Sequence, residues 1–137
     1  PAYYYSQSAV IPWRLTNGEA EIMIILSSKK KHWVVPKGIK EPGMSPKDSA
    51  AEEAREEAGV EGVVGDEPLG SYVYEKWGAD TTCHVYPMEV TCELAYEEWE
   101  ENHRQRTWVT SQQAGAQLSQ PQLGPMVEAL AARLRAR

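Results

Sequence analysis

The sequence predicts one α/β domain in which a sheet packs between helices. Segments typical of strands alternate with helical segments along the chain, and this pattern favours a sheet covered by helices. The 137 residues suffice for one compact domain that removes roughly two-thirds of its surface from water. With 42% hydrophobic and 25% charged residues, the composition excludes collagen, coiled coils and extensive disorder. We therefore expect residues 1–137 to form a single domain.

The N-terminal part of the chain is typical of strands. Tyr3–Arg14 is rich in aromatic and aliphatic residues, and Ala20–Leu26 is an apolar run with β-branched residues. The turn signal at residues 16–18, Thr-Asn-Gly, lies between them and predicts a hairpin. His32–Val35 forms a further short strand that is stopped by residues 36–38, Pro-Lys-Gly.

The clearest helix follows at Pro46–Ala58. Ser45 suits the N-cap, Pro46 suits the first helical position, and Asp48 completes a capping pattern with Ser45. Gly59 is placed to end the helix in a left-handed conformation.

Three further strands and a second helix are expected after Gly59. Val60–Val64 resumes extended structure, and Tyr72–Tyr74 and Thr82–Val90 are expected to be strands joined around residues 77–80. Near the C-terminus, apolar residues recur at helical spacing and predict an amphipathic helix: Met126, Val127, Leu130 and Leu134.

The overall negative charge bears on which classes of molecule the protein can bind. Twenty acidic and fourteen basic residues give a formal charge of −6, which argues against binding a nucleic acid polymer through bulk positive charge. The longest aliphatic run, Ile22–Leu26, is far shorter than the roughly 20 residues that span a bilayer, and the segment after Pro1 does not resemble a signal peptide. We therefore expect a cytoplasmic protein that does not bind membranes.

Cys83 and Cys92 lack CxxC spacing, so we expect two buried small apolar residues rather than a disulfide or a zinc site.

The helix predicted at residues 46–58 carries an unfavourable arrangement of charge. Like-charge pairs four residues apart each destabilise an isolated helix by roughly 0.2–0.5 kcal/mol, and this helix has Asp48/Glu52, Glu52/Glu56 and Glu53/Glu57. Glu53, Glu56 and Glu57 project on one side, and alanines on the other side let the helix lie close to a sheet. Convergent carboxylates are the usual oxygen ligands of Mg²⁺ or Mn²⁺, so we expect these three to hold a metal ion. A solvated acidic face with only a structural role is the alternative.

The residues around this helix match a known motif. Residues 38–44, GIKEPGM, and residues 52–60, EEAREEAGV, resemble the Nudix box, written G-x5-E-x7-R-E-U-x-E-E-x-G-U. The residues at the expected spacing are Gly38, Glu53, Ala54, Glu56, Glu57, Gly59 and Val60. Two positions depart, because Met44 replaces the first Glu of the box and Glu52 replaces its Arg. In the family these two residues are thought to form a supporting ion pair, and both partners are replaced together.

The resemblance implies a Nudix-type α/β/α sandwich with a mixed sheet. It also implies metal-dependent hydrolysis, with Mg²⁺ or Mn²⁺, of a phosphoanhydride bond in a nucleoside-diphosphate-linked or related polyphosphate. By correspondence, Glu53 and Glu57 would be the principal metal ligands, and Glu56 the general base or a further ligand. A peptide carbonyl at the Lys37–Gly38 turn would complete the shell. Relatives sometimes recruit a base from a late loop, so the alternatives here are Glu97, Glu98, Glu100 and Glu101.

Two segments outside the box resemble the diphosphoinositol polyphosphate and diadenosine polyphosphate hydrolase branch, residues 27–38 and residues 99–108. The basic cluster that this branch carries before its first strand is missing, since Tyr5-Ser6-Gln7-Ser8 stands there. The side chains expected to contact substrate phosphates are Ser28, Lys29, Lys37, Arg104 and Arg106. Trp13, Trp77 and Trp99 are candidates for stacking on a base, although packing in the core or rim is favoured.

Met44 and Glu52 also motivate a second hypothesis, a non-catalytic module that binds a nucleotide or a protein on the same scaffold. Of the two, we favour the enzyme, acting on a small phosphoanhydride substrate as a monomer or homodimer.

Overall fold

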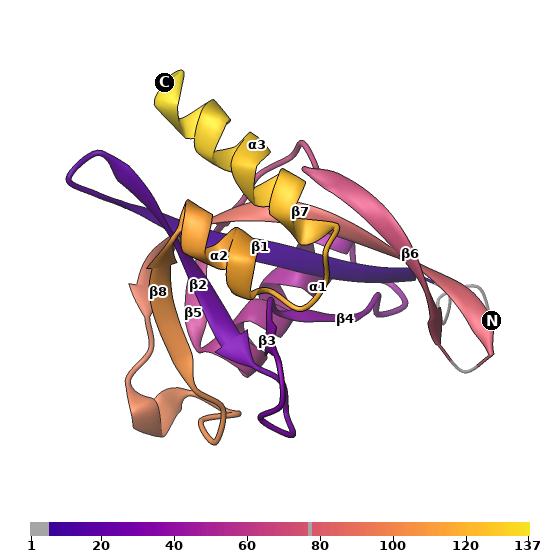
Figure 1. The fold of residues 1–137 in the computed structure, drawn as a ribbon. Helices are drawn as coiled ribbons and strands as arrows, with labels where there is room; N and C mark the ends of the chain where they lie inside the picture. Colours follow the sequence, from indigo (N-terminus) through magenta and orange to yellow (C-terminus); the bar gives the residue numbers. More distant parts are fainter. Residues whose placement is uncertain (1–5, 77) are drawn as a thin grey trace.

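The computed structural model describes residues 6–76 and 78–137 and contains one mixed sheet between layers of helix (Figure 1). In chain order the elements are β1 (Ser6–Thr16), β2 (Glu19–Leu26), β3 (Trp33–Val34), β4 (Lys37–Ile39), α1 (Pro46–Glu53), η2 (Ala54–Ala58), β5 (Val60–Val64), β6 (Gly70–Lys76), β7 (Ala79–Glu93), η3 (Tyr96–Glu98), β8 (Arg106–Thr110), α2 (Ser111–Gln117) and α3 (Leu123–Arg135). The start of the first predicted strand, residues 3–5, and Trp77 lie outside the described residues.

The central strand of the eight-stranded sheet is β1. It pairs antiparallel with β2 and β4, and parallel with β7 from Ser6↔Thr82 to Trp13↔Glu89. β3 and β8 pair with β2, and β5 and β6 pair with β7, all of them antiparallel. The parallel β1–β7 pair among antiparallel pairs makes the sheet mixed, as expected.

Alternate residues of the central strands point to opposite faces of the sheet and build two cores. On one face, Ala9 and Ile11 of β1 belong to a buried cluster with Leu123 and Val127 of α3. On the other face, Val10 of β1 packs in a cluster with the alanines of α1 and η2. Figure 1 shows α2 and α3 on the side of the sheet opposite α1. The expected α/β/α sandwich is confirmed.

The predicted hairpin is present. The last β1–β2 pair, Thr16↔Glu19, leaves Asn17 and Gly18 as a two-residue loop. Their φ angles are 53° and 79°, so both adopt the left-handed conformation that tight hairpins need and that Asn-Gly tolerates.

The predicted helix begins and ends where expected but has a different interior. Ser45 Oγ accepts a hydrogen bond from the Asp48 N–H at 3.0 Å, and Gly59 ends the helix with φ 64°. Between these ends, α1 stops at Glu53 and residues 54–58 form a π-helical turn, in which hydrogen bonds span five residues instead of four. Ala50, Ala54 and Ala58 are all 0% exposed, so the helix packs directly on the sheet.

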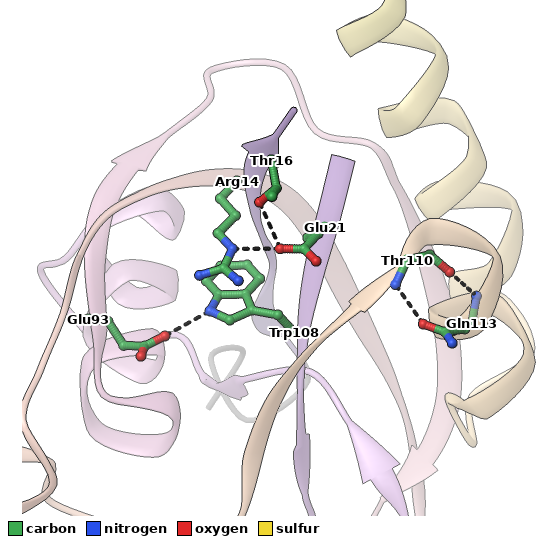
Figure 2. Close-up of polar contacts among 7 residues, drawn as sticks. All are labelled: Arg14, Thr16, Glu21, Glu93, Trp108, Thr110 and Gln113. Carbon is green, nitrogen blue, oxygen red and sulfur yellow. Dashed lines mark hydrogen bonds and ion pairs between the residues drawn. The ribbon is translucent and has the colours of Figure 1, made fainter. Parts of the chain in front are cut away.

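After the helix, β5, β6, β7 and α3 confirm the predicted elements, whereas η3, β8 and α2 were not predicted. Before the helix, β4 was not predicted either, and it begins at Lys37, within the residues that were expected to stop the preceding strand. A capping box starts α2: the Gln113 N–H donates to Thr110 Oγ1 at 3.1 Å, and the Thr110 N–H donates to Gln113 Oε1 at 2.9 Å (Figure 2).

Figure 2 also shows how β8 is fixed to its neighbours. Trp108 Nε1 donates to Glu93 at the end of β7 at 2.8 Å, and the Arg14 guanidinium lies 4.3 Å from the centre of the Trp108 ring. Arg14 also donates to Glu21 of β2 at 2.8 Å. These contacts link strands β1, β2, β7 and β8.

The prediction of two buried cysteines is right for Cys83 and wrong for Cys92, which is exposed. Cys92 lies past the β-bulge at Glu61/Gly62, where the last residues of β7 are exposed. In the part of the chain that the structure describes, no helix combines the length and apolar character needed to cross a bilayer.

Candidate metal and phosphate site

Glu53 ends α1 and Glu57 lies one turn later in η2, so their side chains are neighbours, and β4 contacts both. The Lys37 N–H donates to Glu57 Oε1 at 3.2 Å. Gly38 approaches Glu53 so closely that a Cβ at Gly38 would lie 2.2 Å from Glu53 Cδ. Only glycine leaves room for the carboxylate at this distance, so strand β4, which forms where a turn at Lys37–Gly38 was expected, lies directly against both glutamates.

The surroundings of Glu53 and Glu57 raise the pKa of both carboxyl groups and so disfavour their ionisation. Burial, more than any other cause, raises the pKa of Glu53 to about 8, and the hydrogen bond with Glu57 adds to this effect. Burial also raises the pKa of Glu57, while the Glu53 hydrogen bond and the Arg104 charge oppose the shift. Ionisation of both carboxylates together is therefore disfavoured, and a bound cation would offset this cost.

Glu56 belongs to a neighbouring group of carboxylates. Its carboxylate lies within 4.8 Å of those of Glu100 and Glu101, which come from the loop after η3. Burial, a hydrogen bond with Glu52 and the charge of Glu53 raise the pKa of Glu56 to about 7.

The glutamates of the helix are thus distributed over two adjoining groups. The charge of Glu101 contributes to the raised pKa of both Glu53 and Glu57, so the groups influence each other. Two of the four late-loop glutamates that were alternative bases, Glu100 and Glu101, lie beside Glu56. η3 contains the other two, Glu97 and Glu98. Carboxylate oxygens are the ligands that Mg²⁺ and Mn²⁺ prefer, so the glutamates of these two groups are suited to hold either ion.

Both arginines expected at the substrate have partners within the protein. Arg104 donates to Glu101 at 3.0 Å and to the Leu26 carbonyl at 3.2 Å. Arg106 donates to the carbonyls of Ala58 and Gly59, each at 3.0 Å, and to that of Leu94 at 2.6 Å. The contacts of Arg106 thus give it partners without any substrate, and contact of Arg104 with substrate stays a prediction.

The three other residues expected at the substrate differ in exposure. Lys37 is half-buried in β4, with its Nζ 4.4 Å from the centre of the Tyr74 ring. Burial lowers the pKa of Lys37, because it disfavours the charged ammonium, and an anionic partner beside the side chain would offset this effect. Ser28 and Lys29 lie exposed in the turn after β2.

Sequence reasoning missed a polar group beside Lys37. Gln7 is 1% exposed and its Oε1 accepts a hydrogen bond from the Tyr74 hydroxyl. A small cavity next to this group is lined by Val34, Val35, Lys37, Tyr72, Ser119, Gln120 and Leu123. The alternating tyrosines at positions 72 and 74 were the available signal, because alternate strand residues share a face.

The remaining expectations concern tryptophans and the two departures from the box. Trp13 and Trp99 are 6% and 5% exposed, in agreement with the favoured packing role, and Trp77 lies outside the described residues.

Glu52 pairs with Arg55 at 2.6 Å, and Met44 Sδ accepts a hydrogen bond from Ser49 Oγ at 3.7 Å. Both substituted residues therefore have local partners.

Comparison with known proteins shows the family of this chain. The family model described as NUDIX domain matches residues 6–130. Nudix hydrolase 13, mitochondrial, from Arabidopsis thaliana is 29% identical over 130 residues, which cover 78% of this chain and 63% of that protein. Diphosphoinositol polyphosphate phosphohydrolase 2 from Rattus norvegicus is 37% identical over 94 residues, which cover 66% of this chain and 50% of that protein.

A solved structure, the binary complex of an Ap4A hydrolase from C. elegans, superposes with a TM-score of 0.80 at 18% identity and covers 97% of this chain and 99% of that one. At this identity the superposition shows the fold alone. The chain spans 63% and 50% of the lengths of the two curated relatives named above. The match to the family model extends over most of the sequence and includes every element from β1 to the middle of α3, so the chain belongs to the Nudix family.

Proposed function

We propose that the protein is a divalent-metal-dependent hydrolase that cleaves a phosphoanhydride bond, with water attacking phosphorus. The observation that carries this proposal is the gathering of carboxylates from α1, η2 and the late loop, with the pKa of Glu53 at about 8 and that of Glu56 at about 7. Like charges packed this closely favour a bound cation. Mg²⁺ or Mn²⁺ bound there would neutralise phosphate charge and lower the pKa of a bound water.

In this proposal Glu53 and Glu57 are the principal metal ligands, and Lys37 and Gly38 of β4 orient them. Glu56 is a further ligand or the general base. A pKa near 7 suits a base that must lose and regain a proton at neutral pH. Glu100 and Glu101 are its alternatives, because their carboxylates share its position.

The proposed substrate is a small nucleoside-diphosphate-linked or related polyphosphate. Relatives are named for diphosphoinositol polyphosphate and for Ap4A, so a diphosphoinositol polyphosphate and a dinucleoside polyphosphate are the favoured classes. We rank the dinucleoside polyphosphate first, because Arg104 and Arg106 already have internal partners and fewer cations remain for a densely charged inositol phosphate. Lys37, Lys29 and Ser28 are the proposed phosphate contacts.

The test is turnover in heavy-oxygen water, followed by phosphorus NMR. The protein is incubated with Mg²⁺ and a panel of dinucleoside polyphosphates, diphosphoinositol phosphates, nucleotide sugars and nucleoside triphosphates. We expect one class to be cleaved, with the label on one product phosphate, and turnover to be lost in Glu57→Gln. The matched control is Glu128→Gln, an exposed glutamate of α3. No turnover on any member of the panel, or equal turnover by Glu57→Gln, contradicts the proposal.

We further propose that the protein acts in the cytoplasm, as a monomer or homodimer, and does not act on a nucleic acid polymer. Names of relatives include mitochondrial and chloroplastic proteins, so fractionation of cells that express the complete gene product is the direct test of location.

A further inference from the structure

The π-helical end that carries Glu56 and Glu57 is capped by residues from one distant segment. A helix leaves its last four carbonyls without partners in its own backbone. Here Glu56 O accepts from the Glu101 N–H at 3.1 Å, Glu57 O from Trp99 Nε1 at 3.0 Å, Ala58 O from Arg106 Nη1 at 3.0 Å, and Gly59 O from Arg106 Nη1 at 3.0 Å and the Leu94 N–H at 2.8 Å. Every one of these donors lies between residues 94 and 106.

Arg106 and Trp99 form one unit within this cap. The Arg106 guanidinium lies 4.3 Å from the centre of the Trp99 ring, and its Nη2 donates to Leu94 O at 2.6 Å. A Cβ at Gly59 would lie 2.4 Å from Arg106 Nη1 and 2.6 Å from Trp99 Cγ. Only glycine therefore allows the two side chains to reach the carbonyls. We call Arg106 and Trp99 together the helix clamp.

The clamp acts where this helix is electrostatically weakest. Glu56 and Glu57 lie at the negative end of the helix dipole, where carboxylates are unfavourable. A guanidinium at that end offsets the dipole and satisfies several carbonyls at once, because its donors form a rigid fork. Lysine, a single mobile point charge, does not reproduce this geometry.

We propose that Arg106 and Trp99 are positioning residues, which set the glutamates of η2 against those of the late loop. The backbone of Glu56 and Glu57 is held from the same segment that brings Glu100 and Glu101 to Glu56. The inference rests on the proposed function, and it assigns Arg106 a role distinct from substrate contact.

Two variants test the clamp in the intact protein. Arg106→Lys keeps the charge and removes the fork, and Trp99→Phe keeps an aromatic ring and removes the donor to Glu57 O. Their matched controls are Arg133→Lys, which alters an arginine that donates to the carbonyls of Glu67 and Pro68, and Trp108→Phe, which removes a donor to Glu93. The readouts are kcat, KM and the dissociation constant of Mn²⁺ measured by electron paramagnetic resonance.

We expect both clamp variants to lose about 10- to 100-fold in kcat or in Mn²⁺ affinity, the range typical of residues that orient metal ligands, with KM unchanged within about twofold. The controls should match the wild type. A rise in KM with kcat and Mn²⁺ affinity unchanged would mean that Arg106 contacts substrate, and would overturn the inference. Unchanged kcat, KM and Mn²⁺ affinity in both variants would overturn it as well.

The Mn²⁺ measurement separates this inference from the proposed function. If the wild type turns over no substrate, the proposed function fails, yet weaker Mn²⁺ binding by Trp99→Phe still supports the clamp. If the wild type is active and the variants bind Mn²⁺ and react normally, only the clamp is refuted. Trp99→Phe removes a single hydrogen bond, so it remains informative where Arg106→Lys does not fold.

Discussion

Replacing Gly38 by alanine should move one carboxylate and leave the rest of the protein nearly unchanged. The new Cβ would lie 2.2 Å from Glu53 Cδ and 2.3 Å from Glu53 Oε1. Ordinary contact between such atoms begins at about 3.5 Å, so the carboxylate must shift by about 1.3 Å. The obstructing atoms are at the end of a flexible side chain, and φ at Gly38 is not positive, so we expect the free energy of unfolding to change by less than about 1 kcal/mol.

The shift is large on the scale of a catalytic site. A displacement of about 1 Å can reduce turnover by about 100-fold, so Gly38→Ala should lose activity to that extent while its melting temperature stays close to that of the wild type. The assays are phosphate release with Mg²⁺ and thermal unfolding with and without Mn²⁺. Gly115→Ala is the control, since a Cβ there meets only Gly124 Cα at 3.9 Å. Full activity and normal Mn²⁺ stabilisation in Gly38→Ala would refute the proposed role of Glu53.

Three further predictions concern stability. Without metal, Glu53 and Glu56 bind protons more tightly in the folded protein than in the unfolded chain, where the ordinary glutamate pKa is 4.5. The free energy of unfolding should therefore fall as pH rises from about 4.5 to about 8 and then level off. Urea unfolding in a chelator measures this slope, and a slope equally steep in Glu53→Gln would contradict the assignment. Gly59→Ala should destabilise by at least about 1 kcal/mol, because φ is +64° and the Cβ meets the clamp, and it should cost more than Gly43→Ala, where φ is +83° and nothing lies within 4 Å. If both variants lost the same free energy of unfolding, the side chains of the helix clamp would be able to move aside without cost, which would contradict the prediction. Thr81→Val should stabilise by about 1 kcal/mol, because Thr81 Oγ1 is buried without a hydrogen-bond partner among the described residues, and a lower urea midpoint would indicate a partner.

Local signals made much of the fold predictable. The Asn17-Gly18 loop and the Ser45 cap each depend on residues only a few positions apart, so the adjacent sequence suffices to predict them. The box itself located the helix that carries Glu53 and Glu57. The capping box at Thr110 and Gln113 was an equally local signal, and reading it would have predicted α2.

Other features depend on contacts between distant segments. The π-turn at residues 54–58 could not be predicted from its own alanines and glutamates. The groups that cap this end of the helix come from residues 94–106, which are distant in the sequence. For the same reason, no local pattern indicated that Glu56 would lie with Glu100 and Glu101, and only the family resemblance named these two as alternatives to it. Arg106 matched a motif, but its partners are backbone carbonyls, and a side-chain pattern does not reveal these.

The central claim is that the glutamates of η2 and α1 hold a divalent cation, and anomalous diffraction at the manganese edge tests it most directly. Crystals grown with Mn²⁺ should show an anomalous peak in contact with the carboxylates of Glu53 and Glu57, and the peak should be absent in Glu57→Gln. The claim is contradicted if the wild-type crystals contain no peak there and both carboxylates point into bulk solvent.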